Sequence, residues 1–152
     1  MNEISTAGVT VAYAVSADKP ATGYTKISNI KGISSLNPQP STLDCTDLGE
    51  TEFKRAIPGL KDIGGVITFS ANCTNDFQTA WATLVSAYDA GVAENKSCWF
   101  QIQIPGLEKA FFFAGIPSPL GLSEIAVDEV LSIDAYVTPN KVLGWATKVA
   151  LS

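Results

Sequence analysis

The sequence predicts a mostly β fold, a β-sandwich or small barrel of about seven strands with one flanking α-helix at about residues 75–90. Three observations support this prediction. Several short segments alternate apolar and polar residues, which is the pattern of half-buried strands. One segment instead has apolar residues at the spacing of a helix face. The aromatic content of 9% and the many Val, Ile and Thr residues also favour β structure.

Two candidate strands lie in the N-terminal part of the chain. In residues 9–15, every second residue is a large apolar one: Val9, Val11, Tyr13 and Val15. A turn through residues 18–23 then leads to a second extended segment, 24–33. We therefore expect two strands before the first prolines of the following segment.

A long loop is predicted next. Residues 34–43 contain Pro38 and Pro40, which exclude a helix and a central strand there. Residues 44–65 contain eight charged residues, one proline and four glycines, and no face of this stretch is continuously apolar. Loops of this length are usually functional or disordered. We therefore expect a single domain, 1–152, with a long loop at about 44–64.

A strand and the helix follow the loop. Residues 66–73 alternate as a strand does. Asn75 is the predicted N-cap of the helix, with Gln78 three residues later as in a capping box. Gly91 is the predicted C-terminal stop. The apolar stripe of the helix consists of Phe77, Trp81, Leu84, Val85 and Tyr88.

The C-terminal part predicts strands at 97–104, 110–114 and 125–137, and a last edge strand within 142–151. The strand 110–114 is apolar on both faces, because alternation places Phe112 opposite Phe111 and Phe113. Such a strand must be covered twice, by the core and by either the helix or a neighbouring subunit. These three phenylalanines are therefore candidates for a subunit interface.

The chain carries few of the side chains that common enzymes use. It has no histidine, which removes His-based triads, His metal sites and the usual general base near neutral pH. Cys45, Cys73 and Cys98 are widely spaced, and we expect free buried thiols rather than a zinc site. Neighbouring acids such as Glu50 and Glu52 are expected to be solvated rather than catalytic. We therefore predict no enzyme activity, no cofactor and no metal.

Charge and hydropathy exclude two further classes of partner. The net charge is −5 and Arg55 is the single arginine, which argues against nucleic-acid binding through phosphate contacts. No stretch approaches the roughly 20 apolar residues that span a bilayer, and the N-terminus shows no secretory signal. We therefore expect no membrane association.

The order of these segments resembles that of the major tail tube proteins of long-tailed (siphovirus-type) bacteriophages. The resemblance covers most of the chain and lies in arrangement more than in single residues. It begins with a charged segment at 52–65, E-F-K-R-A-I-P-G-L-K-D-I-G-G, followed by the strand 66–73 and the helix start. A Gln-Ile-Gln-Ile-Pro-Gly strand and turn, the aromatic strand 111–115 and the closing strand 125–137 come next.

This resemblance implies a structural virion protein that self-assembles into stacked hexameric rings and forms the tail tube, the conduit for DNA ejection. The implied partners are copies of the chain itself, a tape-measure protein, and tail terminator and initiator proteins. DNA would pass through without specific binding. The implied location is the virion tail, assembled in the host cytoplasm.

Two sets of candidate contact residues follow from the resemblance. In this family the long loop reaches the adjacent ring, and its charged residues are candidates for that contact: Glu50, Glu52, Lys54, Arg55 and Lys61. Asp128 and Asp134 are expected on the polar face of the closing strand and are candidates for the lumen, because an acidic wall repels phosphates. Two other functions remain open. One is a different ring-forming tail or type VI secretion tube component of the same fold, and the other is a ligand-binding β-barrel module.

Overall fold

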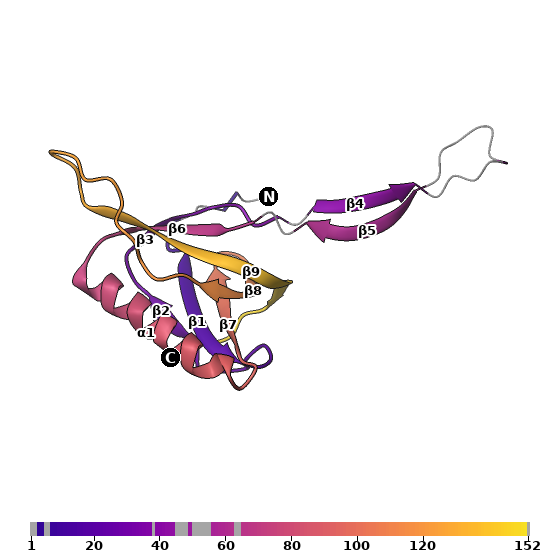
Figure 1. Cartoon of the computed structure of the whole chain (residues 1–152), viewed down its shortest axis with the longest axis horizontal. Coiled ribbons are helices and arrows are strands. Elements are labelled where there is room, and N and C mark those ends of the chain that lie inside the picture. Colours follow the sequence, from indigo (N-terminus) through magenta and orange to yellow (C-terminus); the bar gives the residue numbers. More distant parts are fainter. Residues whose placement is uncertain are drawn as a thin grey trace.

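The computed structural model describes residues 3–4, 7–37, 39–44, 49, 56–62 and 65–151. Within these residues the chain forms nine strands and one helix (Figure 1). In chain order they are β1 (Thr10–Ser16), β2 (Thr25–Ile27), β3 (Ile30–Ile33), β4 (Gln39–Asp44), β5 (Ala56–Asp62), β6 (Ile67–Asn72), α1 (Asn75–Val92), β7 (Ser97–Gln103), β8 (Lys109–Pro117) and β9 (Ser132–Thr147). The predicted mostly β fold with one flanking helix is confirmed. Among the described residues, no helix combines the length and apolar character that crossing a bilayer requires.

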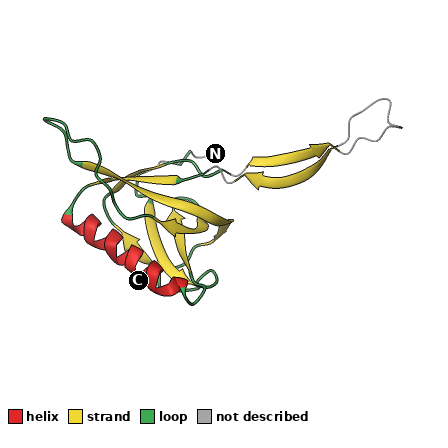
Figure 2. Cartoon of the chain, viewed as in Figure 1, coloured by secondary structure: helices red, strands yellow, loops and turns green. Residues whose placement is uncertain are grey.

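Seven of these strands form one antiparallel sheet in the order β2-β1-β7-β8-β9-β6-β3. The sheet folds back over itself. Two strands separate β6 from β7, which in a flat sheet would place them roughly 14 Å apart. The ring centroids of Phe69 on β6 and Phe100 on β7 nevertheless lie 5.7 Å apart. The two halves of the sheet therefore pack face to face, and Figure 2 shows the helix alongside them.

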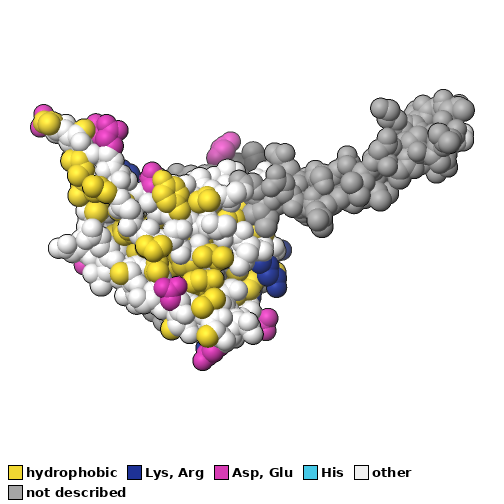
Figure 3. Space-filling model, in the orientation of Figure 1, with side chains coloured by type: hydrophobic (Ala, Val, Ile, Leu, Met, Phe, Trp, Pro, Cys, Tyr) yellow, Lys and Arg dark blue, Asp and Glu magenta, His cyan; other side chains and the backbone are white. Residues whose placement is uncertain are grey.

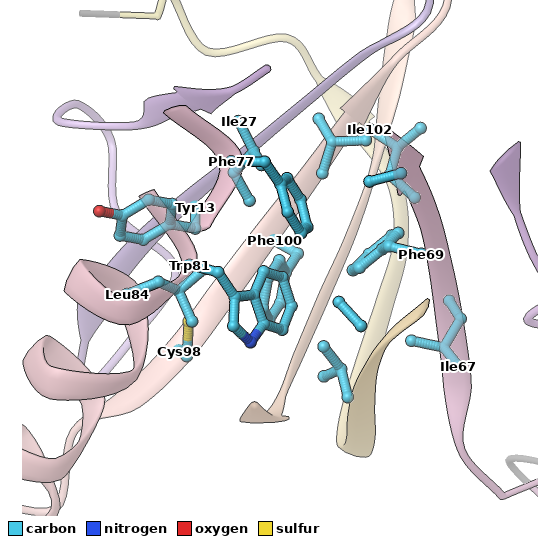
Figure 4. Packing of buried hydrophobic residues seen from close by; sticks show 14 of the residues in the cluster. Tyr13, Ile27, Ile67, Phe69, Phe77, Trp81, Leu84, Cys98, Phe100 and Ile102 are labelled. Carbon is cyan, nitrogen blue, oxygen red and sulfur yellow. The ribbon is translucent and has the colours of Figure 1, made fainter. Parts of the chain in front are cut away.

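The main core lies between the two halves of the sheet and α1. Phe69, Phe77, Trp81, Phe100 and Phe113 are buried in it and contact one another at ring-centroid distances of 5.1 to 6.4 Å (Figure 4). The indole Nε1 of Trp81 donates a hydrogen bond to the backbone oxygen of residue 118, 2.8 Å away. The predicted apolar stripe of the helix therefore faces the sheet, as expected for a core contact.

A second, smaller core lies on the opposite face of the sheet. Phe112 is fully buried there, with the ring of Tyr24 6.0 Å from its own and the Lys19 ammonium 4.4 Å above it. The C-terminal segment covers the same face, because the buried Gln101 side chain accepts a hydrogen bond from the Val149 backbone N–H and donates one to its carbonyl oxygen. The second face of the aromatic strand is thus covered neither by the helix nor by another subunit.

The ends of α1 differ slightly from the prediction. Thr74, rather than Asn75, is the N-cap, since its hydroxyl accepts a hydrogen bond from the Phe77 backbone N–H at 3.1 Å. At the other end, the helix passes Gly91 and ends at Val92. Gly91 is buried in the last turn, where there is little room for a side chain beside Val15.

Three other segments also differ. The predicted extended segment 24–33 is divided at Asn29, whose φ of 69° turns the chain, so that β2 and β3 lie at opposite edges of the sheet. Residues 125–131 are not a strand, and β9 instead runs without interruption from Ser132 to Thr147, past Pro139. The predicted loop 44–64 contains strand β5, which pairs with β4 in a two-stranded hairpin.

Candidate assembly surfaces

The β4–β5 hairpin lies outside the folded body in Figure 1. Its two strands pair with each other, with Asp44 opposite Ala56 and Gln39 opposite Asp62, and they form a sheet of their own. Lys61, one of the predicted inter-ring residues, lies on β5 opposite Pro40. The other four, Glu50, Glu52, Lys54 and Arg55, lie outside the described residues, as does Cys45. A two-stranded hairpin outside the folded body is a geometry that can reach a neighbouring molecule.

The three phenylalanines of β8 do not share one surface. Phe112 and Phe113 are both 0% exposed, one in each core. They have no exposed area with which to contact another subunit, which corrects the prediction for these two residues. Phe111 is half-buried, and its ring makes an edge contact with that of Trp145 at 5.4 Å. The interface prediction therefore rests on Phe111 alone.

Phe111 lines an open apolar groove of about 850 Å³ at one end of the sheet. The groove lies between the segment that follows β3 and the C-terminal half of β9. Its apolar lining comes from Val9, Ile33, Leu36, Ile67, Ile102, Ile104, Phe111, Val142, Leu143 and Trp145. Trp145 is 52% exposed and Leu143 46% exposed at its rim. We call this surface the apolar groove.

Residues 118–131, between β8 and β9, form an extended segment that we call the apolar arm. Its base is fixed to the sheet, since residue 118 donates its backbone N–H to the Tyr136 carbonyl and Leu131 accepts one from Cys73, each at 2.9 Å. Leu131, at the base, is an exposed large apolar side chain, and four more lie beyond it: Leu122, Ile125, Val127 and Val130.

The structure separates the two predicted lumen residues. Asp128 lies in a turn of the arm with a φ of 63°, whereas Asp134 lies on β9 and accepts a hydrogen bond from the Ser70 hydroxyl at 3.0 Å. They are not on one face of one strand, which corrects the prediction of their shared position. Apolar and polar residues alternate from Ile125 onward, but the strand begins only at Ser132, so Asp128 precedes it.

Cys73 and Cys98 are free thiols, and burial raises the pKa of the Cys98 thiol far above its usual range, so this group stays protonated. No group of three or more potential metal ligands occurs in the described part of the chain.

Sequence reasoning missed both the arm and the groove. Ile125 and Val127 continue the alternation of β9, and this similarity led to their assignment to a core-facing strand. They are in fact 68% and 86% exposed. The signal that could have revealed the difference is Glu129, an acid at a position that the alternation assigns to the core.

Solved structures of tail-like particles contain this fold. A chain of the six-fold symmetrised cryo-EM structure of the anti-feeding prophage (AFP) baseplate matches with a TM-score of 0.58 and 10% identity, covering 88% of this chain and 89% of that one. A chain from the tail of an empty GTA particle with C6 symmetry matches with a TM-score of 0.53 and 12% identity, covering 88% of this chain and 93% of that one. No protein-family model and no curated protein matches the sequence.

Proposed function

We propose that this chain is a structural, non-enzymatic subunit of a phage-type tail. It assembles with copies of itself into six-membered rings, and the rings stack into the tail tube that conducts DNA. Its further partners are a tape-measure protein and the proteins that initiate and terminate the tail. It belongs to the virion tail and is assembled in the host cytoplasm.

The observation that carries this proposal is the fold shared with chains of two six-fold particles. Each match covers 88% of this chain and about nine-tenths of the other chain, so the whole subunit, rather than one motif, is comparable. The exposed apolar arm and the apolar groove add independent support, because contiguous exposed apolar surface on a folded chain marks an interaction site.

The proposal is tested by light scattering and electron microscopy of the purified protein over a wide range of concentrations. Rings with six-fold symmetry, alone or stacked, are the expected result. A protein that stays monomeric at every concentration, and also fails to restore tails to a phage lacking its tube subunit, would show that the proposal is wrong.

A baseplate ring is the second candidate function, because the AFP match is to a chain of a baseplate structure. The same microscopy separates the two candidates. A tube subunit continues to add rings along the axis, whereas a baseplate subunit stops at a single ring or a short defined stack. A ligand-binding module would instead remain monomeric with a small molecule in the groove.

A further inference from the structure

The apolar arm exposes several large apolar side chains close together in the sequence. Leu122 is 83% exposed, Ile125 68%, Val127 86% and Val130 74%, all within nine consecutive residues. Single exposed apolar residues are ordinary, but a contiguous group of them marks a binding surface. Figure 3 shows these apolar side chains along the arm, with acidic ones at its tip.

The apolar groove is a surface of matching character at the other end of the molecule. The arm precedes Ser132, whereas the groove is lined by residues 140–145 of the same strand, β9. The eight residue steps from Ser132 to Asn140 span about 26 Å at ~3.3 Å per step. Hydrogen bonds between Ser118 and Tyr136 and between Ser123 and Asp134 hold the arm against the first half of β9, and no residue of the arm lines the groove of its own chain.

Charge also matches between the two surfaces. The arm carries three exposed acids, Glu124, Asp128 and Glu129, and no basic residue. Lys148 lies beside the groove, with its ammonium 3.4 Å from the carbonyl oxygen of Ile104, which lines it. Lys141 also lines the groove, but its ammonium lies over the Trp99 ring, 5.7 Å from the ring centroid. In Figure 3 basic side chains gather at the end of the body opposite the arm. Complementary charges of this kind orient two surfaces as they meet.

Two different surfaces that complement each other, at opposite ends of one chain, define a head-to-tail contact. Such a contact closes into a ring when the rotation between neighbours is a simple fraction of a turn. We propose that the apolar arm of each copy occupies the apolar groove of the next copy within a ring. This inference rests on the proposed function. In such a ring, Phe111 and Trp145 contact the apolar arm of the neighbouring copy.

Cysteine cross-linking tests the contact directly. The background carries Cys45→Ser and Cys73→Ser and keeps Cys98, which is 0% exposed. Val127→Cys on the arm is combined with Leu143→Cys at the groove, and the assembled protein is oxidised. We expect a ladder of covalent multimers up to the hexamer. The matched control pairs Val127→Cys with Val92→Cys, which is 51% exposed at the end of α1, and should give no ladder.

A second variant measures how much the contact contributes. Ile125→Asp with Val127→Asp alters only exposed side chains, so the monomer should keep its unfolding midpoint. The concentration needed for half-assembly should rise at least about tenfold, the effect of losing one interface anchor. Val92→Asp, at a side chain that is 51% exposed at the end of α1, should leave this concentration unchanged.

The outcomes separate this inference from the proposed function. If wild-type rings form but the Val127–Leu143 pair gives no ladder, or if the two-aspartate variant assembles normally, the arm does not occupy the groove and only this inference is wrong. An equally strong ladder from the control pair of Val127→Cys and Val92→Cys overturns it as well. Absence of rings from the wild-type protein under every condition overturns both.

Discussion

At Gly115 on β8 there is no room for a side chain against β9. A Cβ atom on Gly115 would lie 2.6 Å from Cγ1 of Val137 and 2.8 Å from the carbonyl oxygen of Thr138. Real Cβ atoms do not approach other atoms so closely, and the neighbouring atoms belong to a buried side chain and to the backbone. The register between the two strands shifts between Ala114 and Gly115, and Gly115 pairs with Pro139.

Gly115→Ala should therefore destabilise the fold by about 1–3 kcal/mol, the usual cost of overpacking a core. The free energy of unfolding from denaturant titration measures this effect. Gly121→Ala is the matched control, because no atom lies within 4 Å of its Cβ position and it should change stability by less than about 0.5 kcal/mol. Equal stabilities of the two variants would show that β8 and β9 are less closely packed than described.

At the scale of elements, the start of α1 distinguishes two neighbouring residues. The Thr74 hydroxyl accepts hydrogen bonds from the Phe77 backbone N–H and from the Asn29 side chain, at 3.1 and 2.9 Å. Asn75, in contrast, is exposed in the first turn. Thr74→Ala should cost about 1 kcal/mol, the usual contribution of an N-cap, and thermal unfolding would measure it. Asn75→Ala should have little effect on stability. A larger loss of stability from Asn75→Ala than from Thr74→Ala would show that Asn75 is the N-cap, as the sequence predicts.

Elements with at least one face buried in their own chain were predictable. The alternation in 9–15, 66–73 and 97–104, the doubly apolar run 110–114 and the helical stripe all identify real elements, because burial of a face requires apolar residues along it. The same reasoning placed Phe112 opposite Phe111 and Phe113, as the two cores confirm.

Elements without such a face were not predictable. The β4–β5 ribbon joins no larger sheet within the described residues, so no one-sided alternation marks it in the sequence. The arm was predicted wrongly for the opposite reason. An alternating apolar pattern indicates residues that are to be shielded from water. It does not indicate whether their own chain or another molecule covers them. Ile125 and Val127 have the pattern of a core strand and remain exposed in the single chain.

The hairpin can be tested as a separate element. Deleting residues 49–54 shortens the connection between β4 and β5, which pair with each other rather than with the seven-stranded sheet. The domain should therefore keep its unfolding midpoint, but rings should no longer stack if the hairpin tip contacts the adjacent ring. Circular dichroism and electron microscopy measure the two effects. Loss of the fold, or normal tubes, would each contradict this assignment.

At the scale of the whole molecule, charge is the property most relevant to a DNA conduit. Each chain has a net charge of −5, so a ring of six carries −30 (6 × −5). A wall with this balance repels phosphates and favours sliding over adhesion. The two predicted lumen acids lie in different parts of the structure. Asp128 belongs to the arm, whereas Asp134 lies on the sheet and remains the candidate for the wall of the proposed conduit.

Asp134→Lys tests this position in assembled tails. The substitution changes the charge of a ring by +12 (6 × 2) and removes the hydrogen bond from Ser70, which should cost only about 1 kcal/mol. Asp89→Lys on the exposed side of α1 changes the ring charge equally and is the matched control. Both variants should form normal tails. With lysines in the bore, counterion release would make DNA adhere, so ejection from Asp134→Lys particles should be slower, most of all at low salt. Ejection from Asp89→Lys particles should match the wild type. The same ejection kinetics in both variants at low salt would place Asp134 away from the lumen.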